Sequence, residues 1–159
     1  MKALVNGLLL LVMLVGLFGC NPDKDLLPAE EKKDTIAGEW TLGRIRFSGF
    51  PTPYEIENGD VDPAQYGIEE RIRLHSDSTF VLTQRTGEIT DFDGTWKFTG
   101  QDLKLQYRQG VQEQLTLNSN KNSAQLISTP YEEQDTLVNP TTKKPEVVKY
   151  QVQFVYERR

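Results

Sequence analysis

The sequence contains few of the residues on which most enzymes and metal sites depend. It has one cysteine, Cys20, and one histidine, His75, among 159 residues. A single cysteine excludes an internal disulfide and a thiolate metal site within the chain. A glycine-rich phosphate loop and a dinucleotide fingerprint are also missing from the sequence. These absences argue against most nucleophilic, zinc-dependent and nucleotide-dependent chemistry.

The remaining catalytic and metal-binding patterns are weak. His75 precedes Ser76, Asp77 and Ser78, but neighbours at a tight turn point in different directions, whereas a triad needs converging side chains. The segments 60–62 and 91–94 hold acidic residues at alternate positions, and neither continues into a calcium loop with its distal glutamate. We therefore predict a protein that is not an enzyme, with no catalytic residue, no metal and no cofactor.

The one long apolar run lies at the N-terminus, from Gly7 to Phe18, and no charge occurs between Lys2 and Asp23. This run is shorter than the ~20 residues that a membrane-spanning helix needs. A positive charge followed by a short apolar run is typical of a secretion signal. We predict that residues 1–19 are a signal peptide, with an uncleaved membrane anchor as the alternative.

The end of this segment, Leu17-Phe18-Gly19-Cys20, resembles the lipobox of bacterial lipoproteins, although a smaller residue than Phe18 is usual there. The resemblance implies that Cys20 is lipidated, with palmitate-type chains, and becomes the new N-terminus. It places the protein at the outer membrane, on the periplasmic side or at the cell surface. Two acyl chains, at about 0.8 kcal/mol for each buried methylene, give a stable anchor.

Residues 20–35 are predicted to be a tether, because charges and prolines outnumber large apolar side chains there. The acidic residues after Cys20 resemble the export tag of Bacteroidetes-type surface lipoproteins, and a solvated spacer is the alternative. Removal of residues 1–19 takes away Lys2 alone, which leaves 17 basic and 23 acidic residues. This acidic balance argues against nucleic-acid binding.

From Ile36 onward, apolar and polar residues alternate with the period of a β-strand. The clearest run is 146–157, where aromatic and β-branched residues occupy every second position. Turn residues separate such runs at intervals of ~8–12 residues, which is typical of an antiparallel sandwich or barrel. The predicted strands are 39–48, 68–75, 79–87, 93–99, 102–108, 111–118, 123–129 and 146–157, with 91–94 as a turn. Long loops are expected at 49–66 and 130–145, with 135–138 as a candidate extension of a hairpin within the second.

The first strand changes phase at Gly43. Trp40 and Leu42 share one parity, whereas Ile45 and Phe47 share the other. A β-bulge at the glycine would return all four side chains to one face. Such a bulge would also curve the strand, as a small closed barrel requires.

Two short motifs indicate a family. Gly38-Glu39-Trp40 resembles the Gly-x-Trp signature that begins the first strand of lipocalins, and Gly94-Thr95-Trp96 resembles a second such motif in bacterial lipocalin-like lipoproteins. The resemblance covers residues 36–159. It implies an all-β, eight-stranded, up-and-down antiparallel barrel with a calycin-like fold. It also implies that Trp40 and Trp96 plug the barrel and that Arg158 or Arg159 packs over the first tryptophan.

Several polar side chains interrupt apolar faces and are the candidate ligand-binding residues. A buried carboxylate without a partner is costly, so the two glutamates among them should meet water, a partner or a ligand. Two interpretations are open: a wet barrel mouth, or a cavity with polar groups at one end. The candidates are Glu70, Gln84, Tyr107, Glu113 and Tyr150.

Two functions follow as expectations. The first is a membrane-anchored protein that binds a small apolar or amphipathic ligand inside the barrel. The alternative is a filled barrel that acts as an interaction module or inhibitor and binds another cell-envelope protein through the 49–66 and 130–145 loops. Interior volume discriminates between them, because a barrel of eight strands either fills with side chains or holds one ligand.

Overall fold

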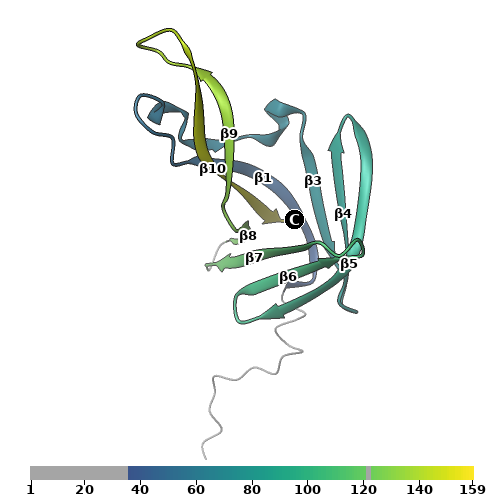
Figure 1. Cartoon of the computed structure of the whole chain (residues 1–159). Coiled ribbons are helices and arrows are strands. Elements are labelled where there is room, and N and C mark those ends of the chain that lie inside the picture. The colour runs from purple at the N-terminus through teal and green to yellow at the C-terminus, as the bar shows by residue number, and fades with distance from the viewer. Residues whose placement is uncertain (1–35, 121–122) are drawn as a thin grey trace, which may run out of the picture.

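A computed structural model describes residues 36–120 and 123–159. The predicted signal peptide, Cys20 and the tether lie outside these residues. The described chain confirms the predicted all-β, eight-stranded, up-and-down antiparallel barrel: each ring strand pairs with the next, and β1 closes the ring on β10 (Figure 1). The ring strands are β1 (Gly38–Ser48), β3 (Glu69–Leu74), β4 (Thr79–Thr86), β5 (Glu88–Thr99), β6 (Asp102–Tyr107), β7 (Gln112–Ser119), β8 (Ala124–Ser128) and β10 (Pro145–Arg158).

Two further strands occupy the segments that were expected to be loops. β2 (Gly59–Val61) pairs with β1, between two short 3-10 helices, η1 (Glu55–Glu57) and η2 (Pro63–Tyr66). β9 (Tyr131–Val138) pairs with the first half of β10. The expectation of a loop over most of 130–145 was therefore wrong. β10 is 14 residues long and offers β9 a template, even though β9 is acidic and lacks the alternating apolar pattern.

The predicted turn at 91–94 was also wrong. β5 continues through residues 91–94. The turn of the β4–β5 hairpin lies before this segment, at Gly87, whose φ is 103°. Asp91 is accommodated in the strand because it accepts a 2.7 Å hydrogen bond from the hydroxyl of Thr83 on β4. Gly94 is not a turn residue. It allows β5 and β6 to lie close together, because a Cβ there would collide with the backbone oxygen of Gln106.

The predicted bulge at Gly43 is confirmed. In the β1–β10 ladder Leu42 pairs with Tyr156, and the next pair joins Arg44 to Val155, so Gly43 is the extra residue. A Cβ on Gly43 would lie 2.9 Å from the side chain of Glu157, which leaves little room for a larger residue. The shift brings the second half of β1 into phase with the core.

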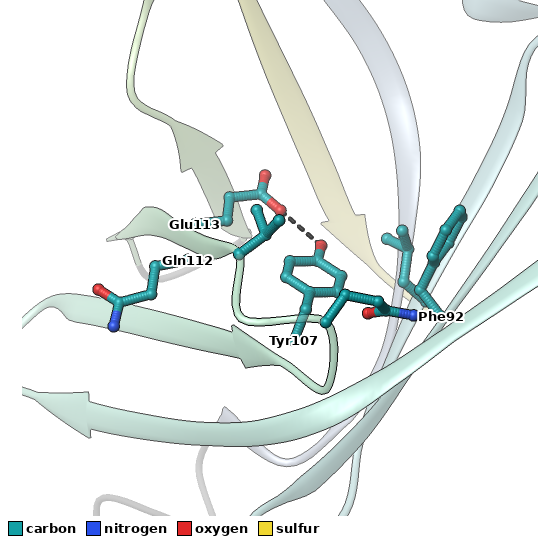
Figure 2. A pocket seen from close by; sticks show the side chains of 7 residues that line it. Phe92, Tyr107, Gln112 and Glu113 are labelled. Atoms are coloured by element: carbon teal, nitrogen blue, oxygen red, sulfur yellow. Dashed lines mark hydrogen bonds between the residues drawn. The ribbon is translucent and has the colours of Figure 1, made fainter.

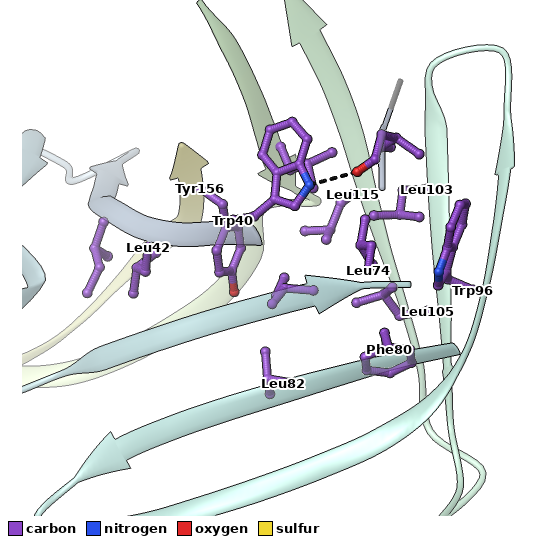
Figure 3. Packing of buried hydrophobic residues seen from close by; sticks show 14 of the residues in the cluster. Trp40, Leu42, Leu74, Phe80, Leu82, Trp96, Leu103, Leu105, Leu115 and Tyr156 are labelled. Atoms are coloured by element: carbon purple, nitrogen blue, oxygen red, sulfur yellow. Dashed lines mark hydrogen bonds between the residues drawn. The ribbon is translucent and has the colours of Figure 1, made fainter. Parts of the chain in front are cut away.

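The core fills one end of the barrel (Figure 3). Trp40 is fully buried there and donates a 2.9 Å hydrogen bond from Nε1 to the carbonyl of Ile36. The guanidinium of Arg158 lies 5.7 Å from the centre of the Trp40 ring. Trp96 is also buried, and its Nε1 donates to the carbonyl of His75 at 3.0 Å. Hydrogen bonds from the two tryptophans thus connect the core to the segment before β1 and to the turn between β3 and β4.

The other end of the barrel is open. β6 pairs with β5 only from Gly94 onward, so the first half of β5 has β4 as its only neighbour among the described strands. β9 likewise pairs with β10 alone. The β4–β5 and β9–β10 hairpins therefore extend beyond the closed ring and diverge from each other (Figure 1).

Candidate functional site

A cavity lies where β5 leaves β6. It has a volume of about 460 Å³ and is bounded by the inner face of the β4–β5 hairpin and by the turn between β6 and β7. Apolar atoms make up most of its wall, and Glu113 supplies a carboxyl group (Figure 2). The lining residues are Leu82, Phe92, Tyr107, Gln109, Val111, Gln112 and Glu113.

Tyr107 and Glu113 face each other across the β6–β7 turn. The hydroxyl of Tyr107 donates a 2.7 Å hydrogen bond to Oε2 of Glu113 (Figure 2). The turn is closed by a hydrogen bond from the amide of Tyr107 to the carbonyl of Val111, at 2.9 Å. Phe80 packs edge-on against the Tyr107 ring at 5.0 Å, which fixes the ring. The hydrogen bond and the ring contact therefore fix the positions of the tyrosine hydroxyl and the carboxyl.

A second carboxyl group, that of Glu70, lies deeper in the barrel and is 8% exposed. Its Oε1 accepts a hydrogen bond from the hydroxyl of Tyr156 on β10, and its Oε2 accepts one from the amide of Gln84 at 3.2 Å. Glu70 and Gln84 are direct partners in the β3–β4 ladder. Three strands thus converge on one buried carboxyl.

Burial raises the pKa of both glutamates. Loss of water is the main cause for Glu70, and the charge of Glu113 raises its pKa further, against the opposing hydrogen bonds from Tyr156 and Gln84. Burial likewise raises the pKa of Glu113, and the hydrogen bond from Tyr107 opposes it. The two carboxyls are therefore close enough to interact electrostatically, and their charged forms are costly.

The structure brings together four of the five candidate ligand-binding residues, Glu70, Gln84, Tyr107 and Glu113, in two linked hydrogen-bonded groups. Tyr150 lies apart from these groups. Its ring stacks on Phe50 with 4.4 Å between centroids, and Phe47 packs beside it at 5.9 Å. The 49–58 segment therefore covers Tyr150.

Sequence reasoning missed Tyr156 as a polar partner, although it placed this residue on the inward face of the last strand. The parity of β10 indicates only that Tyr156 points inward. Its contact with Glu70 depends on the closure of β10 onto β1 and on the bulge at Gly43, which set how far along the barrel the hydroxyl lies. No local sequence signal carries that information.

The other candidate sites of the sequence have local roles. The carbonyl of His75 accepts hydrogen bonds from Ser78 and Trp96. Asp62 caps η2 through the amide of Ala64, which is the expected turn chemistry, whereas Asp60 contacts Arg46. Within residues 36–120 and 123–159, no group of three or more His, Cys, Asp or Glu side chains is placed to hold a metal ion.

No family model, curated protein or solved structure matches the chain. In the described ranges, no helix has the length and apolarity needed to cross a membrane. The class that fold and site define is therefore an eight-stranded antiparallel barrel, filled at one end, with a cavity, the buried carboxyl of Glu70 and the half-buried carboxyl of Glu113 toward the other.

Proposed function

We propose that the barrel binds a small apolar or amphipathic molecule in the cavity beside Tyr107 and Glu113. The cavity itself carries this proposal, because about 460 Å³ of space, open to solvent, lies beside the Tyr107–Glu113 pair. Small-molecule sites commonly measure about 300–1,000 Å³ and combine apolar walls with a few placed polar groups. Leu82 and Phe92 supply the apolar wall, and the Tyr107–Glu113 pair supplies the polar end.

Binding suits these polar groups better than catalysis. An acid–base pair generally has environments that push the two pKa values apart. Here burial raises the pKa of both Glu70 and Glu113. Each carboxyl also accepts a hydrogen bond from a tyrosine, Tyr156 or Tyr107. The arrangement favours recognition of a ligand group over proton transfer to and from a substrate.

A lipocalin-like origin for the barrel is part of the same proposal. Trp40 begins β1 at the closed end of the barrel, after Gly38. Arg158, from the last strand, lies over its ring and donates a 2.9 Å hydrogen bond to the carbonyl of Ala37. This arrangement supports the resemblance of the Gly-x-Trp motif to that of lipocalins, with Arg158 rather than Arg159 in the packing position.

Narrowing the cavity should weaken binding. Val111 lines the cavity and is 62% exposed, so Val111→Trp adds bulk at its edge with little cost to the core. With the uncharged fluorescent probe N-phenyl-naphthylamine, we expect binding to the starting protein and about a tenfold weaker affinity in Val111→Trp, equivalent to about 1.4 kcal/mol. Fluorescence titration measures the change.

The matched control is Val138→Trp, because Val138 is 64% exposed but lies on β9, outside the lining of the cavity. It should leave the probe affinity within about twofold, since a surface substitution changes energies by only about 0.5 kcal/mol. Equal losses in both variants, or no probe binding at all, would count against a ligand-binding barrel.

An interaction module is the second candidate, and the free edge of β9 favours it. Among the described strands, β9 pairs with β10 on one side only, so its other edge presents backbone donors and acceptors. An extended segment of another cell-envelope protein can add to such an edge. Crosslinking from the β9–β10 hairpin tests this candidate. A partner protein crosslinked to this hairpin, together with no binding of the fluorescent probe in the cavity, would favour the interaction module over ligand binding.

The location at the outer membrane through a lipid on Cys20 is also a proposal, based on the Gly19-Cys20 boundary that follows the short apolar run. We expect Cys20→Ser to move the protein from the membrane fraction to the soluble fraction, because the acyl chains supply the anchor. Fractionation and intact-mass measurement give the readout. A Cys20→Ser protein that stays in the membrane pellet with residues 1–19 attached would indicate a spanning anchor.

A further inference from the structure

The two faces of the barrel wall differ in charge. Strand pairing places Arg71, Arg85 and Lys149 on the outer face, opposite in parity to the core residues of their strands. Among the described strands, Arg158 is the one basic residue with inward parity, and it lies over Trp40 at the closed end. The open half of the interior therefore carries carboxyl groups and no basic side chain from the strands.

Several carboxylates on the outer face have basic partners. Glu39 lies 3.2 Å from both Arg71 and Arg73, and Glu132 lies 2.7 Å from Lys149. By contrast, the structure shows no ion pair to Glu70 or Glu113 within residues 36–120 and 123–159. These two inward-facing groups have neutral hydrogen-bond donors as their partners.

The inner face of β9 extends this acidic lining toward the opening. Glu133 pairs directly with Tyr150, and Asp135 pairs with Val148, so both acidic residues share the face of these inward residues. Burial raises the pKa of Tyr150, and the charges of Asp135 and Glu133 raise it further. A cation that approaches through the open end therefore meets acidic groups at the rim before it reaches Glu113.

The cavity wall beside Glu113 is aromatic. Tyr107 and Phe92 pack edge to face with 6.5 Å between their centroids, and both line the cavity. Aromatic rings attract a cation through the electron density of their faces. A carboxylate without a basic partner, next to aromatic rings and an apolar pocket, is the combination that recognises an ammonium group on an apolar body.

We propose that the ligand of this barrel is an amphipathic amine, with its ammonium group at Glu113 and its apolar body against Leu82 and Phe92. The inference rests on the proposed ligand-binding function and names its substrate class. A ligand carboxylate would place a third negative charge beside two buried carboxyls, which is unfavourable. A neutral alcohol would leave both carboxyls without a cation.

The test compares octylamine, octanol and octanoate, which differ only in the head group. Each displaces N-phenyl-naphthylamine from residues 20–159 carrying Cys20→Ser, which lack both the apolar 7–18 run and the acyl chains, so that no detergent is needed. We expect octylamine to bind about tenfold more tightly than octanol, and octanoate to bind most weakly, because a charge-assisted hydrogen bond is roughly twice as strong as a neutral one. Added salt should reduce the advantage of the amine.

Glu113→Gln removes the charge and keeps the shape, so it should reduce the ratio of amine to alcohol affinity several-fold. Glu70→Gln is the second variant, should the first fail to fold. The matched control is Glu132→Gln on the outer face, which should leave the ratio unchanged. If the probe binds but octanol or octanoate binds as tightly as octylamine, the amine inference is wrong and ligand binding stands. If neither the probe nor any octyl compound binds, both proposals are wrong.

Discussion

Trp40→Ala is expected to destabilise the domain by about 3–5 kcal/mol, the range for emptying a large buried aromatic site. Trp40 is fully buried, and the substitution also removes the hydrogen bond from its Nε1 to the carbonyl of Ile36 and the ring under Arg158. Because native domains are stable by only about 5–15 kcal/mol, this loss is a large part of the total. Urea unfolding followed by far-UV circular dichroism measures it.

Two variants make the Trp40 result interpretable. Trp40→Phe keeps most of the buried ring and loses the Nε1 donor, so it should cost less than the alanine variant. Ile56→Ala shortens a side chain that is 90% exposed and should change stability by no more than about 0.5 kcal/mol. A loss below about 1 kcal/mol for Trp40→Ala would show that this end of the barrel does not depend on the tryptophan.

The strands of the ring follow from sequence because a half-buried strand has a period of two. The alternation around Trp96 and Phe98 places these side chains inward wherever the strand ends. The same parity argument placed Glu70, Gln84 and Glu113 inside the barrel, where the structure brings them into two adjacent groups. Polar residues on an apolar face were therefore the informative signal for the site.

Strand ends and long-range pairing were harder to predict. Aspartate is a common turn residue, and only the β4–β5 ladder shows that Asp91 lies in a strand. β9 exists because β10 is long enough to pair with it. Tyr150 packs against Phe50 from the 49–58 segment, and the sequence gives no rule for where that segment folds. Such contacts join residues far apart in the chain, so local patterns do not reveal them.

The double variant Glu70→Gln/Glu113→Gln is expected to be more stable than the starting protein at about pH 8 and equal to it near pH 4. Burial raises the pKa of both carboxyls in the folded state. Their stabilising contribution is therefore fully present below the unfolded pKa of glutamate, about 4.3, and is lost as pH rises through the folded pKa. Glutamine stays neutral throughout and can still accept hydrogen bonds from Tyr107 and Tyr156.

Thermal unfolding from about pH 4 to pH 9 measures this effect, since each kcal/mol shifts Tm by a few degrees in a domain of this size. The neighbouring tyrosines, Tyr107, Tyr156 and Tyr131, have pKa values that burial raises further above the ordinary value of about 10, so they stay neutral across this range. Glu132→Gln, which removes an exposed ion pair, should change stability by no more than about 1 kcal/mol.

A gain in the stability of the double variant at high pH would show that the barrel retains two costly charges that a neutral pair would relieve, as expected where a binding site is kept at the expense of stability. A double variant less stable than the starting protein at about pH 8 would show instead that the tyrosine hydrogen bonds outweigh the cost of burying the charges.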